Sequence, residues 1–410
     1  MDGYFDGDET RAPDAREAAL FAALPQLLSD AAARAPAWAA RLEGVDPAAI
    51  NSRAALAALP VTRKSELMAA QREAPPFGGF LAVEPDALAR IYLSPGPVFA
   101  AQGREPDPWQ AARALYAAGV RSGELAANTF GYHMTPGAFI MESGLAALGC
   151  PVFAAGPGHP GEVLETLAAL RPTVYCGVPD YLNILLDKAA EAVLSLGFTK
   201  ALVSGAALPA ALRARIEARG VSVAQCYATA DLGVVAYESP AREGLIVSER
   251  MIVEIVRPGT GDPVAEGEVG EIVVTRLANT AYPLIRFATG DLTAALPGPS
   301  PCGRTNMRIR GWMGRADQRT KVKGMFVDPA QIAEVVRRHP AIARARLVVT
   351  RAGHVDAMTL RVEGPDAANA AAIAETLKRV TRLTGEVEVV APGSLPNDGK
   401  VIADERPADG

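Results

Sequence analysis

The stretch TVYCGVPDYLNILLDKAAEAV, residues 173–193, decides the fold class expected for this chain. It begins with a short apolar run bounded by Gly177 and Pro179, and it continues as a longer segment with apolar residues at helical spacing. The same order, a short apolar run and then an amphipathic segment, recurs in residues 149–172 and 200–220. Alternation of this kind predicts βαβ units and a largely parallel sheet, hence an α/β fold.

The regions on either side of these units have different patterns and predict two domains. Residues 16–42 carry apolar residues at helical spacing. From about residue 245 to 312, apolar and polar residues alternate between Gly, Pro and Asp turns, which predicts an antiparallel, barrel-like subdomain. We therefore expect residues 1–316 to form a large N-terminal domain. Residues 317–410 have a compact α+β pattern and should form a small C-terminal domain, joined near Asp317.

Composition and charge argue against several classes of partner. The 410 residues carry a formal net charge of -5 and no block of Lys or Arg, so neither nucleic acid nor an anionic membrane is an expected partner. The sequence contains no run of about 18 apolar residues that could span a bilayer. The acidic N-terminus lacks the apolar core of a signal peptide. Cys150, Cys176, Cys226 and Cys302 are scattered, which predicts free thiols in the cytoplasm rather than a zinc site or disulfides.

The segment AYPLIRFATGDL, residues 281–292, places a guanidinium and a carboxylate in an otherwise apolar stretch. In one interpretation, Arg286 and Asp291 form a surface ion pair that flanks a hairpin. In the other, the segment holds a polar ligand, with Thr289 and Gly290 forming the turn that directs Asp291. An ionised carboxylate accepts hydrogen bonds, which suits the second interpretation, a polar ligand at Asp291.

Three segments together resemble the adenylate-forming acyl-CoA ligases, in particular the phenylacetate-CoA ligase branch. They are YPLIRFATGDLT (282–293), GRADQRTKVKG (314–324) and LPNDGKV (395–401), and the resemblance covers nearly the whole chain. It implies ATP, Mg²⁺ and coenzyme A as cofactors, a small-molecule carboxylic acid as substrate, and a C-terminal domain that moves between two reaction steps.

The resemblance also implies roles for residues in these segments. Asp291 would bind both ribose hydroxyls of ATP, and Arg286 would be its structural neighbour. Arg315 would reach the ribose or the α-phosphate, and Lys400 the acyl carboxylate and the α-phosphate. The implied hinge is Asp317, and the residues implied for the thiolation step are Lys321 and Gly324. The plainer alternatives are that Arg315 and Asp317 belong to a surface loop, and that Lys400 is a solvated lysine.

Further residues resemble the nucleotide and acyl sites of the same family. SGAALPAALRARIEARG (204–220) resembles the strand, turn and helix along the adenine, and CYATADLG (226–233) stands where the family has Y-G-x-[ST]-E. The implied nucleotide-binding residues are Ser204, Gly205, Ala206, Ala207, Tyr227 and Thr229, and the implied metal ligand is Asp231. The resemblance makes His133 a catalytic residue beside the acyl carboxylate. It places Tyr132, Phe139 and Met141 in the acyl pocket. A structural glycine turn, a packed or surface His133, and plain core packing explain many of these residues equally well.

The segment IYLSPGPVFAAQGREPDPW, residues 91–109, departs most from the family pattern. Relatives carry a Ser/Thr/Gly-rich phosphate loop that ends in lysine, but here Pro95 and Pro97 each lack an N–H donor, and Arg104 is the nearest cation. The loop at 93–104 is therefore degenerate.

The leading prediction is ATP-dependent, AMP-forming ligation of an aromatic, phenylacetate-like acid to coenzyme A. The alternatives are a non-adenylating protein that binds nucleotide or CoA, and an enzyme that catalyses only thioester formation. The sequence leaves the oligomeric state open, with a homodimer as one candidate.

Overall fold

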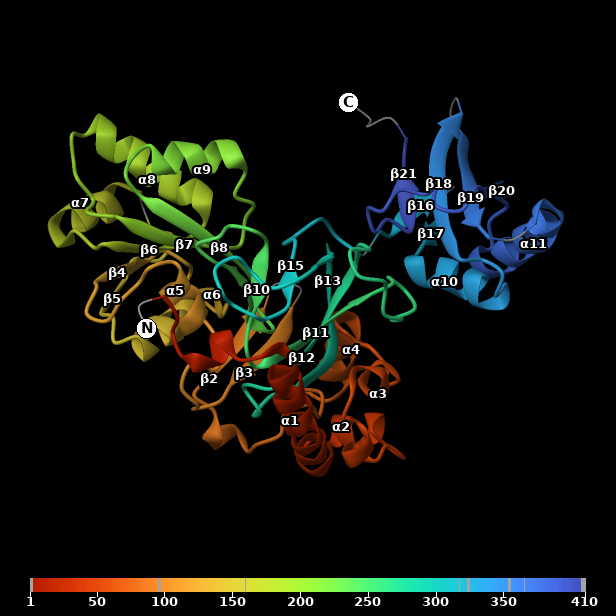
Figure 1. Ribbon diagram of the computed structural model, residues 1–410, viewed down its shortest axis with the longest axis horizontal. Helices are drawn as coiled ribbons and strands as arrows, with labels where there is room; N and C mark the ends of the chain where they lie inside the picture. Colours follow the sequence, from red (N-terminus) through yellow and green to blue (C-terminus); the bar gives the residue numbers. More distant parts are fainter. Residues whose placement is uncertain are drawn as a thin grey trace. The chain divides into compact units, whose positions relative to one another are not determined.

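The structure, a computed structural model, describes residues 3–94, 97–158, 160–316, 318–322, 325–352, 355–364 and 366–406 (Figure 1). The chain divides into two compact units, and each is described by itself. Unit 1 comprises Met1–Val253, Val274–Phe287 and Leu296–Gly311. Unit 2 comprises Glu254–Val273, Ala288–Ala295 and Trp312–Gly410.

The largest sheet is mixed, with nine strands within the described residues. Its order is β14-β15-β10-β9-β8-β7-β6-β4-β5. The strands are β4 (Ala126–Asn128), β5 (Val152–Ala154), β6 (Val174–Gly177), β7 (Lys200–Val203), β8 (Ser222–Thr229), β9 (Gly233–Glu238), β10 (Leu245–Val247), β14 (Ala295–Leu296) and β15 (Arg308–Ile309). Neighbours from β5 to β8 pair in parallel, whereas β8, β9, β10 and β15 pair antiparallel. The expected α/β fold with βαβ units is confirmed.

Helices cover both faces of the parallel part (Figure 1). They are α5 (Ala112–Ala117), α6 (Gly137–Ala147), α7 (Pro160–Leu170), α8 (Pro179–Glu191) and α9 (Ala210–Glu217). Strand β6 shows why two layers form, because successive side chains of a strand point to opposite faces. Val174 and Cys176 pack in one core cluster with residues of α5 and α6, and Tyr175 packs in another with residues of α7, α8 and α9.

Close packing of α5 and α6 depends on Gly144. A methyl group at this position would lie 2.6 Å from the carbonyl carbon of Ala111, which real side chains do not tolerate. We expect Gly144→Ala to lower the free energy of unfolding by about 1–3 kcal/mol through overpacking, although alanine favours an isolated helix by about 1 kcal/mol. Urea unfolding measures the difference. Gly137→Ala in the same helix is the control, since its nearest neighbour would be a Phe130 ring carbon at 3.8 Å. Equal or greater stability of Gly144→Ala would contradict this account.

The antiparallel region is divided between two sheets. Strands β10 and β15 join the large sheet, and β11 to β13 form a second sheet in the order β1-β13-β12-β11. Its strands are β1 (Thr62–Arg63), β11 (Met251–Val256), β12 (Gly270–Arg276) and β13 (Leu284–Thr293). The region predicted as one subdomain therefore contributes to two sheets, because an alternating pattern predicts a strand but does not specify its partner. Four helices precede most of these strands in the chain, α1 (Pro13–Arg34), α2 (Pro36–Arg41), α3 (Arg53–Ala57) and α4 (Lys64–Glu73).

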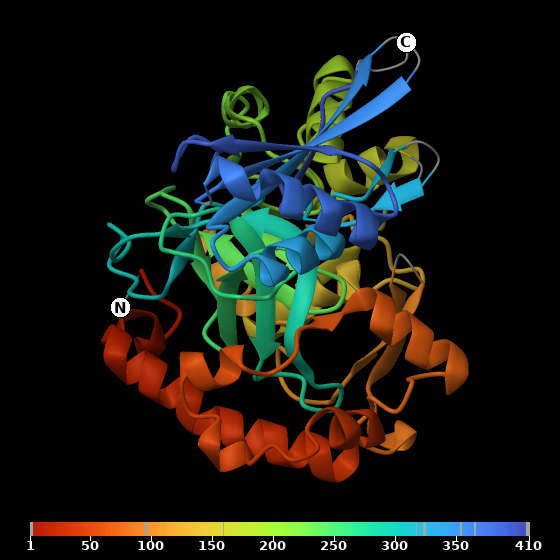
Figure 2. The same ribbon diagram turned by 90° about the vertical axis from the view of Figure 1, so that its right-hand side faces the viewer.

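The C-terminal part of unit 2 has a sheet of its own, in the order β20-β19-β18-β21. Its strands are β18 (Arg344–Ala352), β19 (Val355–Glu363), β20 (Glu386–Val390) and β21 (Ile402–Asp404). Helices α10 (Pro329–Arg338) and α11 (Ala370–Thr381) lie side by side on one face of it (Figure 2). Leu347 of β18 and its cross-strand neighbours Leu360 and Ile402 belong to the core cluster on that face. A hairpin of β16 (Thr320–Val322) and β17 (Met325–Val327) precedes α10.

Among the described residues, no helix combines the length and apolar character needed to cross a membrane.

Candidate functional site

Many of the expected site residues follow the carboxyl ends of parallel strands in unit 1. Tyr132 and His133 come after β4, Ser204 begins the loop after β7, and Asp231 is the second residue after β8. In open α/β sheets, ligands bind in the crevice beyond the carboxyl ends of the strands. The fold therefore brings residues from distant parts of the sequence to one edge of the sheet. A methyl group on Gly205, for instance, would lie 3.5 Å from Val178 and 3.7 Å from Phe130.

The loop after β7 offers backbone rather than side chains. Ser204 is buried, and its hydroxyl donates to the carbonyl of Cys226 at 2.9 Å. Gly205 has a positive φ of 78°, which glycine adopts without strain. Ala206 and Ala207, like Gly205, are exposed. Small exposed residues of this kind permit close approach to the backbone.

Strand β8 and the turn after it hold two further expected residues. Tyr227 is buried within β8, opposite Ala236 of β9. The hydroxyl of Thr229, at the end of the strand, accepts the N–H of Leu232 at 3.1 Å and so closes the turn that contains Asp231. Thr229 therefore has a structural task in this turn.

The buried Asp231 carboxylate forms an ion pair with Lys64, whose Nζ lies 2.9 Å from Oδ2. Lys64 is the first residue of α4, and about a third of its side chain is exposed. Arg276 holds the backbone at this point, donating to the carbonyl of Asp231 at 2.9 Å. Burial lowers the pKa of Arg276 to about 10, so it stays charged at neutral pH. Lys64 was not predicted as a site residue, since in sequence it is one charged residue at a helix start.

Of the residues expected around the acyl group, Tyr132 and Phe139 contact each other, whereas His133 is exposed and Met141 is buried in the core. Asn128 donates to the hydroxyl of Tyr132 at 3.1 Å, and the rings of Tyr132 and Phe139 meet edge to face at 5.3 Å. Burial and then the nearby Glu142 raise the pKa of Tyr132, so the phenol keeps its proton. His133 is exposed on the loop between β4 and α6. Met141 is only 1% exposed and packs in the core cluster with α5.

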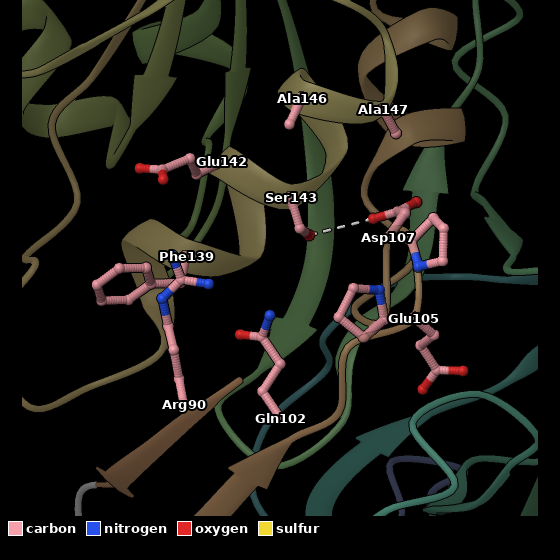
Figure 3. A pocket seen from close by; sticks show the side chains of 11 residues that line it. Arg90, Gln102, Glu105, Asp107, Phe139, Glu142, Ser143, Ala146 and Ala147 are labelled. Carbon is pink, nitrogen blue, oxygen red and sulfur yellow. Dashed lines mark hydrogen bonds between the residues drawn. The ribbon is translucent and has the colours of Figure 1, made fainter. Parts of the chain in front are cut away.

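A pocket of about 390 Å³ opens beside Phe139 (Figure 3). Its lining comes from β2, β3, the segment after β3, and α6, namely Arg90, Gln102, Glu105, Pro106, Asp107, Pro108, Phe139, Glu142, Ser143, Ala146 and Ala147. The Arg90 guanidinium lies 4.8 Å from the centre of the Phe139 ring. Ser143 donates to Asp107 at 3.2 Å. The pocket thus combines one aromatic wall with several polar groups.

The degenerate phosphate loop, residues 93–104, includes the end of β2 and all of β3. Strands β2 (Arg90–Ser94) and β3 (Val98–Gln102) pair antiparallel, with Ser94 opposite Val98. The Ser94 side chain is buried and donates to the carbonyl of Val98 at 3.1 Å. Pro95 and Gly96, which follow Ser94 in the chain, lie outside the described residues. The hydroxyl that fits the family pattern is therefore engaged within the hairpin.

In unit 2, Asp291 lies near the end of β13 and is 8% exposed. Its Oδ1 accepts hydrogen bonds from Trp312 Nε1 at 3.0 Å and from Arg315 Nη1 at 3.1 Å. The Asp291 N–H bonds to Thr289 Oγ1 at 3.1 Å, and Gly290 between them has a φ of 74°. The structure thus brings Asp291 and Arg315 together and holds the carboxylate in a fixed orientation.

Arg286, in the same strand, has a different setting. Its guanidinium is buried and donates to the carbonyl of Ala57 at 2.8 Å and to that of Leu59. These contacts tie the end of α3 to β13 and agree with a structural role.

The remaining expected residues lie in the C-terminal part of the chain. Lys400 is exposed, and its N–H donates to Asp398 Oδ1 at 3.0 Å. Lys321 is exposed on β16, with Nζ 5.9 Å from the centre of the Phe326 ring. Asp317 and Gly324, the expected hinge and thiolation residues, lie outside the described residues.

Comparison with known proteins agrees with this arrangement of motifs. Residues 110–280 match the family described as AMP-binding enzyme, and residues 324–406 match the AMP-binding enzyme C-terminal domain. The phenylacetate-coenzyme A ligase of Thermus thermophilus is 30% identical over 336 residues, which is 78% of this chain and 74% of that protein. The phenylacetate-coenzyme A ligase of Aromatoleum evansii is 29% identical over 396 residues, 89% and 88% of the two chains.

Among solved structures, the chain resembles 2-hydroxyisobutyryl-CoA ligase in two reaction states. The postadenylation state, in complex with R3-HIB-AMP, is 26% identical with a TM-score of 0.73, and the match covers 99% of this chain and 93% of that one. The thioesterification state, with 2-HIB-AMP and CoA, is 26% identical with a TM-score of 0.70, covering 97% and 91%. The fold, the motif geometry and these relatives agree: the chain belongs to the phenylacetate-coenzyme A ligase family of AMP-binding enzymes.

Proposed function

We propose that this protein joins a carboxylic acid to coenzyme A through an acyl-adenylate, at the expense of ATP. The observation that carries the proposal is the Asp291 carboxylate, which is buried and held by Trp312 and Arg315. An anion fixed in this way is ready to accept hydrogen bonds from a diol, as expected for a ribose. A surface ion pair flanking a hairpin, the alternative interpretation, does not require a buried carboxylate.

In the proposed first step, an oxygen of the acid's carboxylate attacks the α-phosphorus of ATP. The bond from this phosphorus to the bridging oxygen breaks, and pyrophosphate leaves. Asp291 would hold the ribose, and Arg315, which donates to Asp291, would reach the ribose or the α-phosphate. The backbone of Gly205–Ala207 and the ring of Tyr227 flank the adenine, with Ser204 and Thr229 fixing the two loops. Lys400 offsets the negative charge that develops on the phosphoryl oxygens.

We propose that Mg²⁺ enters the site bound to the phosphates of ATP and is held there by one carboxylate. No group of three or more His, Cys, Asp or Glu residues within the described part of the chain is placed to hold a metal. Mg²⁺, however, commonly binds through one carboxylate together with substrate phosphates. Asp231 would supply that carboxylate, and Mg²⁺ would neutralise phosphate charge. Lys64 already places an ammonium beside Asp231 and would offset further charge where the phosphate loop lacks a lysine.

We expect Asp231→Asn to raise the Mg²⁺ concentration needed for half-maximal adenylation by at least about tenfold, because a unit charge about 4 Å away contributes about 4 kcal/mol near a protein surface. The measurement is a Mg²⁺ titration of ATP–pyrophosphate exchange at fixed ATP. Asp262→Ala, which removes an exposed aspartate, serves as the control. The same Mg²⁺ dependence in Asp231→Asn and the wild type would remove Asp231 from the metal site.

In the proposed second step, the chain from Asp317 onward turns, Lys400 departs, and the face that carries Lys321 and Gly324 arrives. The thiolate of coenzyme A then attacks the acyl carbon, and AMP leaves with the bonding electrons. The related 2-hydroxyisobutyryl-CoA ligase supports this proposal, because its structures include a postadenylation state and a thioesterification state with CoA.

The acid is proposed to be aromatic and phenylacetate-like, as for the named relatives. Tyr132 and Phe139 supply an aromatic wall, and His133 lies on the loop beside Tyr132. We retain Met141 only as a core residue behind this wall, since its side chain is enclosed.

One observation favours a second candidate, an enzyme that performs only the thioester-forming step. Ser94 is engaged within the β2–β3 hairpin, and its neighbour Pro95 has no N–H to offer a phosphate. A chain that receives a ready-made acyl-adenylate would not need the β- and γ-phosphate cradle.

Acid-dependent exchange of labelled pyrophosphate into ATP tests the proposal. We expect exchange with phenylacetate or a close analogue, and CoA thioester formation in the complete assay. Thioester formation from synthetic phenylacetyl-AMP without any exchange across an acid panel would favour the second candidate. Nucleotide binding with neither reaction would leave a binding protein on a ligase scaffold.

The proposed compartment is the cytoplasm. All four cysteines are free, and Cys150, Cys176 and Cys226 are buried, which suits a reducing environment.

A further inference from the structure

The segment that carries Lys400 is fixed on one side to the small C-terminal sheet. Asp398 forms a bidentate ion pair with Arg346 of β18, with N–O distances of 2.8 and 3.1 Å, and Arg346 is buried. Arg344, on the same face of β18, donates to the carbonyls of Leu395 and Pro396 at 3.1 Å each. These charged contacts make the segment part of the small sheet.

On its other side, the same segment lies against the turn before β12 and the end of β13. The side chain of Asn397 accepts the N–H of Val269 at 2.9 Å and donates to the carbonyl of Gly267 at 3.1 Å. At Gly399 there is no room for a side chain, because a methyl group would lie 2.7 Å from Val269 Cγ1 and 3.1 Å from both Leu292 methyl carbons. Leu292 directly follows Asp291, the residue proposed to bind the ribose. Gly399, the residue before Lys400, therefore lies against the same strand as Asp291.

The two sets of contacts differ in strength. The Arg346–Asp398 pair is charged and bidentate, with its guanidinium buried, and such hydrogen bonds are roughly twice as strong as neutral ones. Asn397 makes two neutral hydrogen bonds from an exposed position. The stronger contacts therefore keep the segment with the small sheet, and the weaker ones can open and close.

We propose that Asn397 is a positioning residue, a latch that docks the Lys400 segment on the β12–β13 region for adenylation and opens for thioester formation. The inference rests on the proposed function, because the latch matters only if Lys400 serves the first step and leaves before the second. Gln318 accompanies the segment through both states, since its side chain bonds the carbonyl of Gly399 and the N–H groups of Val401 and Ile402 at 2.6–3.0 Å. The closed latch is the state seen in the structure.

The test compares Asn397→Ala with the wild type by two kinds of measurement on the full chain. Hydrogen–deuterium exchange of the Val269 amide reports the latch itself, without any reaction. Initial rates with phenylacetate and ATP, and separately with synthetic phenylacetyl-AMP and CoA, report the two steps. Asn51→Ala, which removes an exposed asparagine of unit 1, is the matched control. Gly399→Ala is a second variant, which leaves the hydrogen bonds of Asn397 in place but crowds Val269 and Leu292 and strains the backbone, since Gly399 has a φ of 70°.

We expect Asn397→Ala to speed Val269 amide exchange by roughly tenfold and to slow adenylation by a similar factor, as for the loss of one or two hydrogen bonds. Thioester formation from phenylacetyl-AMP should keep its rate or increase. Unchanged exchange at Val269 would overturn the latch, and so would an equal loss of both steps. If the wild type makes no acyl-adenylate although Val269 is protected through Asn397, the docking stands and the proposed function fails.

Discussion

Replacement of Lys400 by alanine is expected to slow acyl-adenylate formation by about 100- to 1,000-fold, the usual effect of removing one group that stabilises transition-state charge. The lysine is exposed and directly follows Gly399, which lies against Leu292, the residue after Asp291. Among the described residues, the Lys400 side chain makes no contact on which the fold depends. The free energy of unfolding should therefore change little. ATP–pyrophosphate exchange measures the first step.

The same variant should form thioester from synthetic phenylacetyl-AMP and CoA at nearly the wild-type rate, because the ammonium has no task once the adenylate exists. Lys378→Ala, which removes an exposed lysine at the end of α11, controls for the general loss of positive charge. Equal loss of both steps would show that Lys400 serves binding or folding and would contradict its assignment to adenylation.

Replacement of Asp291 by alanine is expected to weaken ATP binding by at least about 100-fold. Each hydrogen bond to a charged group contributes about 1.5–3 kcal/mol, and a ribose diol would lose two of them. The change also leaves Trp312 and Arg315 without the carboxylate oxygen to which they donate, so the walls of the site lose their alignment. Isothermal titration calorimetry with ATP measures the affinity directly.

Asp291→Asn refines this result, since the amide keeps the shape and one acceptor but loses the charge. It should bind ATP with an affinity between those of the wild type and the alanine variant. Asp262→Ala, at an exposed position in unit 2, should leave affinity unchanged. Unaltered ATP binding in Asp291→Ala would take this residue out of the nucleotide site and remove the main support for the proposed function.

Local periodicity predicted the βαβ units well because each strand and helix buries its own apolar face. The stretch 173–193 shows this directly, with Val174 and Tyr175 facing opposite layers and α8 following at once. The expected residues at strand ends also lie together, since the parallel order fixes where those ends meet. Pairing of distant strands was not predictable in the same way. Strand β10 joins the large sheet and β11 the smaller one, although both lie in one continuous alternating region.

Two contacts that the sequence did not reveal join residues far apart in the chain. Lys64 and Asp231 are separated by 167 positions, and Asn397 and Val269 by 128. Asn397 lies in the segment LPNDGKV, but neither Asn397 nor Lys64 has a role that the sequence indicates, and each role follows only from the partner that the fold supplies. Met141 is the opposite case, since its neighbours in sequence indicate an acyl pocket but helix periodicity turns its side chain into the core.

The indole that donates to Asp291 has an optical consequence. Of the three tryptophans, Trp38 and Trp109 are 2% and 0% exposed, whereas Trp312 is 57% exposed. Iodide dissolved in the buffer will therefore quench the fluorescence of Trp312 and leave the emission of the other two nearly untouched. A nucleotide whose sugar takes over the Asp291 oxygen must displace or cover this indole, so the protein carries its own unlabelled reporter of site occupancy.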